Sequence, residues 1–111
     1  MIETIIREHL LSRLDCPVWL EMPKNPPERF VLLERTSGGE ENWVKYPTVA
    51  VQSYGASLYE AADLNEAVKM AMKELVERDE VSSVSLNSDY NFTDTTNHKY
   101  RYQAVFDLVH Y

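Results

Sequence analysis

Apolar side chains recur with two different periods along this chain, and each change of period predicts a new element. A repeat of three or four residues over residues 2–14 predicts a first helix of about 13 residues, which Pro17 closes. A second helix is expected over residues 57–77. Ser57 and Glu60 have the spacing of a capping box at its start. Its apolar stripe contains Ala61, Leu64, Val68, Ala71, Met72 and Leu75.

Alternation of apolar and polar side chains predicts five strands. They cover residues 18–22, 30–35, 43–54, 81–86 and 100–109. The last has the strictest alternation, with its even-numbered positions expected in the core. Pro47 cannot donate to a strand partner, so the early part of the third strand is expected at an edge or a bulge. Residues 36–42 are predicted to form a turn, and the polar residues 87–99 a projecting hairpin loop. Tyr90 and Phe92 leave open an extension of the flanking strands into that loop.

These elements follow one another in the order α-β-β-β-α-β-β. Two amphipathic helices on one face of a largely antiparallel sheet make an α+β fold. We find no repeat, linker or shift in composition, so residues 1–111 are predicted to form a single domain.

Composition and charge narrow the classes of function. Hydrophobic residues make up 44% of the 111 residues and charged residues 26%, which is typical of a globular domain. Eleven Lys and Arg against 18 Asp and Glu give a formal net charge of −7. An acidic protein is a poor candidate for specific nucleic-acid binding. No apolar run reaches the ~18 residues of a membrane span, and the N-terminus lacks the pattern of a signal peptide. We therefore expect a soluble, intracellular protein with no membrane partner.

Neither the cysteine nor the histidines indicate a reactive or metal-binding centre. Cys16 is the only cysteine, so no internal disulfide can form, and we expect a buried or incidental thiol, not a nucleophile. His9, His98 and His110 fall in three different elements and lack the spacing of zinc ligands. We expect His9 at the rim of the first helix.

A calcium loop and a glycine-rich phosphate-binding loop are excluded, because the sequence lacks residues that each of them requires. Residues 89–94 place oxygens as the start of a calcium loop would. However, Asp94 stands where glycine is needed, and Tyr100 stands where a bidentate acid is needed. Three glycines cannot supply a phosphate-binding or dinucleotide-binding loop. The sequence therefore predicts no enzyme, no catalytic residue, no metal and no cofactor.

Aromatic side chains are the most suggestive feature of the surface. Seven Tyr, three Phe and two Trp include several on strand faces that cannot all point inward. Tyr and Trp are enriched at protein–protein interfaces because they bury a large area and keep one polar contact. An alternative is a second sheet face half covered by loops. The candidate interface residues, from strand faces and the hairpin loop, are Trp43, Tyr46, Tyr54, Tyr90, Phe92 and His98.

One succession of segments resembles a known family. Residues 30–33 and the Ser37-Gly38-Gly39 turn lead to the aliphatic strand 48–54, and the helix that starts at Ser57 follows directly. This pattern, over most of the chain, resembles the small tail terminator or tail-completion proteins of long-tailed bacteriophages and prophages.

The resemblance implies a non-enzymatic assembly protein without cofactors. Such a protein forms a homo-oligomeric, hexameric ring on the head-proximal end of the tail tube, stops tube polymerisation and joins the head connector. Its implied partners are therefore its own copies, the tail tube protein and the connector or neck protein. It is implied to reside in the bacterial cytoplasm during assembly and then at the tail–head junction of the virion. Two alternatives stay open: a neck or head–tail joining protein of the same virion, and a small α+β regulatory or ligand-binding module.

Overall fold

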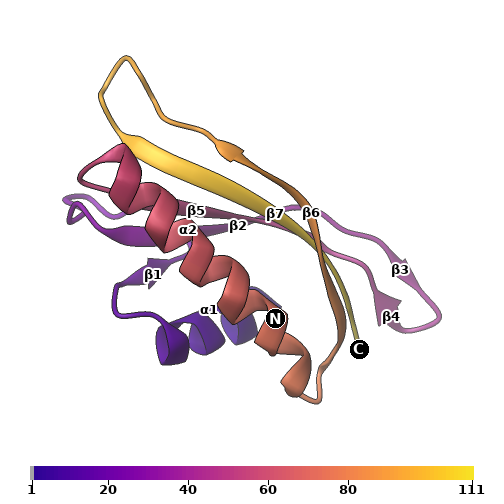
Figure 1. The fold of residues 1–111 in the computed structure, drawn as a ribbon. Coiled ribbons are helices and arrows are strands. Elements are labelled where there is room, and N and C mark those ends of the chain that lie inside the picture. The colour runs from indigo at the N-terminus through magenta and orange to yellow at the C-terminus, as the bar shows by residue number, and fades with distance from the viewer. Residues whose placement is uncertain (1) are drawn as a thin grey trace.

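The computed structural model describes residues 2–111, which form a twisted sheet with two α-helices packed against it (Figure 1). The elements are α1 (Ile2–Arg13), β1 (Val18–Trp19), β2 (Phe30–Ser37), β3 (Glu40–Glu41), β4 (Val44–Lys45), β5 (Thr48–Gly55), α2 (Leu58–Lys73), the 3-10 helix η1 (Glu74–Glu77), β6 (Val81–Asn91) and β7 (Tyr100–His110). Among these strands only the β1–β2 pair is parallel. The α+β prediction is confirmed, with two short strands more than the sequence indicated.

Strands β5 and β7 lie at the centre of the sheet. β2 and then β1 continue the sheet beyond β5, and β6 pairs with the other edge of β7. Val49 lies opposite Phe106, and Val51 lies opposite Ala104. The β3–β4 hairpin joins the sheet where Lys45 pairs with His110, so it extends beyond the start of β5.

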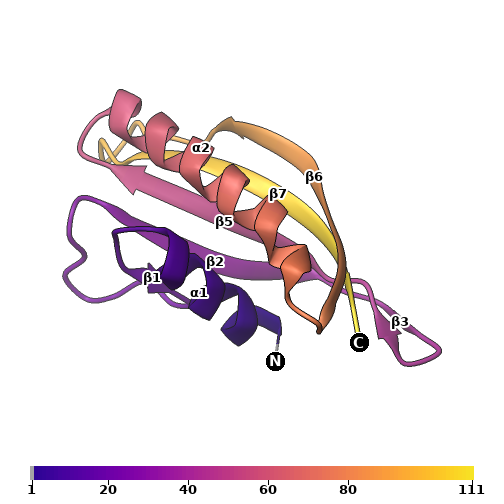
Figure 2. The same cartoon turned by 60° about the horizontal axis from the view of Figure 1, so that its bottom comes forward.

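Both helices cover the same face of the sheet (Figure 2). The strict alternation along β7 places Ala104, Phe106 and Leu108 in the core, which confirms the predicted even-numbered face. From α2, Leu64 and Val68 reach the same layer and are fully buried. The opposite face, which we call the outer face, has no helix over it in the described part of the chain.

The start of α2 confirms the predicted cap and refines it. The Ser57 hydroxyl accepts a hydrogen bond from the Glu60 backbone N–H at 3.2 Å. The Glu60 carboxylate reaches one residue further back and accepts from the Ala56 N–H at 3.0 Å. Gly55 is required just before this turn, because a Cβ there would lie 2.5 Å from the backbone nitrogen of Ala61. The helix then continues as η1 through Glu77, where the sequence predicted its end.

Two predicted strands are wrong in extent. The strand predicted over residues 18–22 pairs with β2 only at Val18 and Trp19, and Leu20 and Met22 are exposed. The chain leaves the sheet there and enters a proline-rich loop, so residues 20–22 have no partner strand despite their alternating pattern.

The strand predicted over residues 43–54 is interrupted. Asn42 and Trp43 have positive φ angles and form a turn, and Pro47 separates β4 from β5. The residues predicted as a plain turn before it instead contain the end of β2 and all of β3. At the other end of the sheet, β6 runs as far as Asn91, so the flanking strand does extend into the predicted loop.

His9 is part of the core and does not lie at a rim. Its side chain is 1% exposed, with Nε2 2.7 Å from the Ala71 carbonyl oxygen. Arg78 Nε donates to His9 Nδ1 at 3.1 Å, so Nε2 carries the proton and donates to Ala71. Burial lowers the pKa of His9 and keeps the ring neutral. The rim prediction failed because Arg78 reaches His9 only through the 3-10 turn that ends α2. Cys16 is buried, as expected.

Candidate functional site

The predicted interface residues fall into two groups at opposite ends of the sheet (Figure 1). Trp43 and Tyr46 lie at the β3–β4 hairpin. Tyr54, Tyr90, Phe92 and His98 lie where β5 ends and where β6 and β7 are joined. The molecule is elongated and measures 44 × 25 × 24 Å along its principal axes.

The β3–β4 hairpin presents an unusually exposed tryptophan. Asn42 and Trp43 have φ angles of 51° and 70°, the sign that a two-residue hairpin turn of type I′ requires. The Trp43 side chain is 87% exposed. Backbone hydrogen bonds in both directions between Gly39 and Tyr46, at 3.3 and 2.8 Å, fix the base of the hairpin. The indole is therefore held out from the domain on a short, hydrogen-bonded support.

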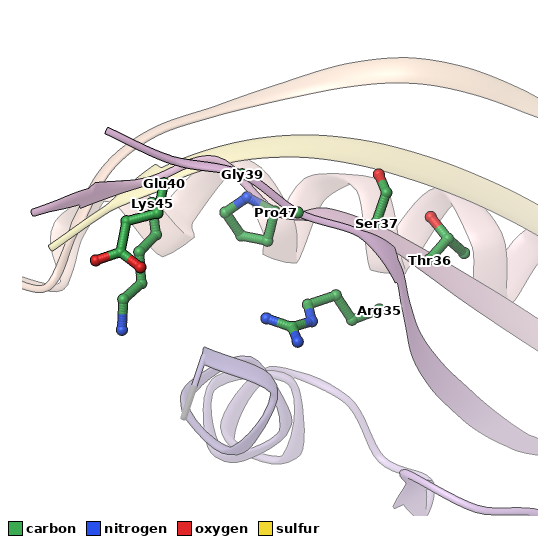
Figure 3. A pocket seen from close by; sticks show the side chains of 8 residues that line it. Arg35, Thr36, Ser37, Gly39, Glu40, Lys45 and Pro47 are labelled. Atoms are coloured by element: carbon green, nitrogen blue, oxygen red, sulfur yellow. The ribbon is translucent and has the colours of Figure 1, made fainter. Parts of the chain in front are cut away.

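A hollow of about 490 Å³ lies beside the base of this hairpin (Figure 3). Arg35 and Lys45 extend into the space between the strands and α1, with the Glu40 carboxylate near Lys45 (Figure 3). The hydroxyl-bearing residues in the lining, Thr36 and Ser37, have no imidazole or thiol beside them in that lining. This arrangement suits charge pairing with a partner, and it lacks the nucleophile–base pair that covalent catalysis needs.

At the opposite end, Tyr54 is not available to a partner. It is 4% exposed and stacks on Phe30 with ring centroids 4.3 Å apart, and Trp19 packs on the other side of Phe30. Its prediction as an interface residue is wrong. The alternation correctly placed Tyr54 away from the helices, but its cross-strand neighbour Phe30 covers it.

A polar network crosses the outer face from β5 to β6. Arg101 donates to the Tyr54 hydroxyl at 3.0 Å, and that hydroxyl donates to the side-chain amide oxygen Oε1 of Gln52 at 3.0 Å. Gln52 then donates to Gln103 at 2.9 Å, and Gln103 donates to the Tyr90 hydroxyl. Each amide and hydroxyl in the row has a partner, so the outer face is kept in order by hydrogen bonds without an apolar layer over it.

The aromatic side chains of the β6–β7 end are braced by Arg101. Its guanidinium carbon lies 4.5 Å from the Phe92 ring centroid, and its Nε donates to the Phe92 carbonyl at 2.7 Å. Tyr90 meets Phe92 edge to face at 5.9 Å. Tyr90 and Phe92 are about 40% exposed, so both rings still present a surface to solvent.

The loop beyond them holds its own shape. Asp94 accepts hydrogen bonds from the Asn97 side chain and from the backbone N–H groups of Thr96 and Asn97. The bond from the Asn97 side chain, with the others, lowers the pKa of Asp94. His98 is exposed and has a φ of 53°. The loop therefore offers an ordered, polar tip.

The structure also contains a groove that the sequence reading missed. Between α2 and the edge strand β6 lies an apolar hollow of about 210 Å³. Met70 and Leu86 border it and are 66% and 50% exposed. Lys69, at its rim, forms ion pairs with Glu66 and with Asp89. We call this hollow the α2–β6 groove. Met70 was the available signal, because it is an apolar residue outside the buried stripe of α2.

Within residues 2–111, no three His, Cys, Asp or Glu side chains are grouped so that they could hold a metal ion. No helix in that range has the length and apolarity to cross a membrane. The chain matches no protein-family model, and no curated protein matches it either. The fold and these surfaces thus define a small α+β domain with exposed aromatic side chains at both ends of its sheet.

Proposed function

We propose that this protein is a non-enzymatic virion assembly protein: a tail terminator that forms a ring on the head-proximal end of a phage tail tube. The observation that carries the proposal is the placement of two different exposed aromatic surfaces at opposite ends of one sheet. A ring needs such a subunit, because each copy contacts its neighbours through two different patches. The resemblance of residues 30–68 to the tail terminator family supports the same function.

The outer face of the sheet fits a role against a tube end. It is broad, lacks a helix layer in the described residues, and carries the ordered polar row that ends at Tyr90. Interfaces that form between separately folded proteins are of this mixed character, with polar contacts around aromatic anchors. The net charge of −7 is also compatible with a ring through which DNA passes, since like charges repel.

A tube-capping assay tests the proposal. Purified protein is added to polymerising tail-tube subunits, and tube lengths are measured by electron microscopy. We expect shorter tubes that carry extra density at one end only. A matched variant replaces residues 95–98 with Asn-Gly, which shortens the loop between the bridged pair Asp94 and Lys99. This variant should keep its melting temperature and cap less efficiently.

Two results would contradict the proposal. Unchanged tubes together with binding to the head connector would indicate the neck protein of the same virion. Unchanged tubes with no binding to either component would favour the small regulatory or ligand-binding module.

A further inference from the structure

The tip of the β3–β4 hairpin and the α2–β6 groove are matched in size and in apolar character. The hairpin ends in the almost fully exposed indole of Trp43, while the groove is an apolar hollow of about 210 Å³ without an occupant from its own chain. An apolar cavity of roughly 150 Å³ takes up benzene, so the groove is of a size to receive a bicyclic ring. Trp is also the side chain that most often anchors protein interfaces.

The walls of the groove suit an indole. Met70 lies on one side and Leu86 on the other, with the buried ring of Phe106 at the bottom. Thioether sulfur packs favourably against aromatic rings. The alkyl chains of Lys69 and Lys73 complete the rim, and their ammonium groups can lie over an aromatic face.

The charges beside the two features are complementary. In the hairpin, Glu40 lies directly opposite Lys45, whereas Glu41 lies opposite Val44 and has no cation across from it. At the groove, Lys69 is already paired with two carboxylates, whereas Lys73 forms no ion pair within the described residues. An indole seated in the groove would bring Glu41, next to the turn, toward Lys73.

The hairpin cannot fill the groove of its own chain in this fold. It projects beyond the end of the sheet and points away from α2 (Figures 1 and 2). Its link to the rest of the sheet runs through the pairing of Lys45 with His110. A second copy is therefore the occupant that supplies this hairpin.

We propose that the β3–β4 hairpin of one copy docks in the α2–β6 groove of a second copy, with Trp43 between Met70 and Leu86 and Glu41 beside Lys73. This contact rests on the proposed function, in that it supplies the copy-to-copy contact of the ring, with the α2–β6 groove and not the β6–β7 end as the patch that receives the hairpin. It is heterologous: each docked copy still has one free hairpin or groove, so contacts propagate until the ring closes.

Photo-crosslinking tests the contact directly. Trp43 is replaced by p-benzoylphenylalanine, which keeps an aromatic ring at the tip, and isotopically light and heavy chains are mixed. The mixture is irradiated at high protein concentration and on tail tubes, and the crosslinks are mapped by mass spectrometry. We expect crosslinks between different chains, from position 43 to residues 66–73 or 84–86. The same probe at Tyr59, which is 80% exposed on the first turn of α2, serves as the control. It should give no crosslink between chains to Met70 or Leu86.

Substitutions give a second readout by sedimentation. Trp43→Ala should weaken self-association roughly 30-fold, the scale of an interface hot spot. Glu41→Lys and Lys73→Glu should each weaken it about threefold, as exposed ion pairs do, and the double variant should restore it. Glu21→Lys, an exposed charge change elsewhere, is the control and should have no effect.

The outcomes separate this contact from the proposed function. Capped tubes with crosslinks that map to another surface would overturn the contact and leave the terminator proposal standing. Hairpin-to-groove crosslinks with tubes of unchanged length would support the contact and contradict the terminator proposal. Crosslinks only within one chain, or none under either condition, would overturn the contact.

Discussion

The two faces of the sheet are organised by different forces. The face under the helices is closed by apolar packing, with Val49, Val51 and Phe106 almost completely buried beneath α2. The outer face has no such layer in the described residues, and amide and hydroxyl side chains there form a row of hydrogen bonds. The covered face therefore accounts for folding, while the outer face, the ends of the sheet and the α2–β6 groove at the edge of the covered face are available to partners.

The largest expected effect is the loss of a core ring from the covered face. Phe106→Ala should lower the free energy of unfolding by about 3–5 kcal/mol, because it leaves a cavity beneath α2. Asp107→Ala is the neighbouring change on the outer face. It removes hydrogen bonds from Thr48 and Asn87 and should cost only about 1 kcal/mol. Urea melts measure both, and equal losses would contradict the difference between the faces.

The next effect concerns the junction that holds α2 over the sheet. Gly55→Ala should cost about 1–3 kcal/mol, because the new Cβ would press on the backbone of Glu60 and Ala61 at the first turn of α2. Gly39→Ala is a matched control, since nothing lies within 4 Å of the Cβ it would add. If both variants melt alike, the close approach of β5 and α2 is absent.

The buried histidine between the helices predicts a dependence of stability on pH. Burial lowers the pKa of His9 below 6.5, so below that pH the unfolded chain binds a proton that the folded chain does not. Stability should be complete above about pH 6.5 and fall as the pH drops toward the folded pKa, by at most about 1.4 kcal/mol per pH unit for this group. Denaturant melts between pH 5 and 8 measure the slope.

Two variants show which histidine causes the dependence of stability on pH. His9→Gln keeps a side-chain N–H for Ala71 and should reduce the slope, and the remainder belongs to His110, whose pKa burial also lowers. His110→Gln should remove that remainder. A slope that His9→Gln does not alter would contradict the role of this residue.

The smallest expected effect lies at the helix cap. Ser57→Ala should cost about 1 kcal/mol, because the Glu60 N–H loses its acceptor at the start of α2. Ser82→Ala, on the exposed edge strand, is the comparison and should be neutral within the error of a thermal melt. A neutral Ser57→Ala would mean that the cap does not contribute to holding α2 in place.

The spacing of apolar residues along the chain correctly predicted the elements that pack into the covered face. The alternation of β7, the cap at Ser57 and the apolar stripe of α2 each depend on local sequence and a single buried side, and all three are present. The predictions that failed depend on contacts far apart in the chain. His9 is held in the core by hydrogen bonds with Ala71 and Arg78, and Tyr54 is covered by Phe30. No local pattern could indicate which distant residue would arrive there.

The sequence indicated which residues of the candidate surfaces are exposed, but it did not indicate how they are grouped in space. An excess of aromatic residues correctly selected Trp43, Tyr46, Tyr90 and Phe92 as exposed. Their separation to opposite ends follows from the sheet order, which composition does not encode. The α2–β6 groove likewise depends on β6 lying at the edge beside Met70.

Hydrogen–deuterium exchange tests most directly the claim that the β3–β4 hairpin, the α2–β6 groove and the end of β6 make the contacts, and that α1 does not. Exchange is measured on the isolated protein and on protein bound to tail tubes. The account predicts that protection increases at residues 40–46, 66–73 and 84–91, while α1 exchanges as before. Increased protection centred on α1, with no change at the hairpin or the groove, would contradict it.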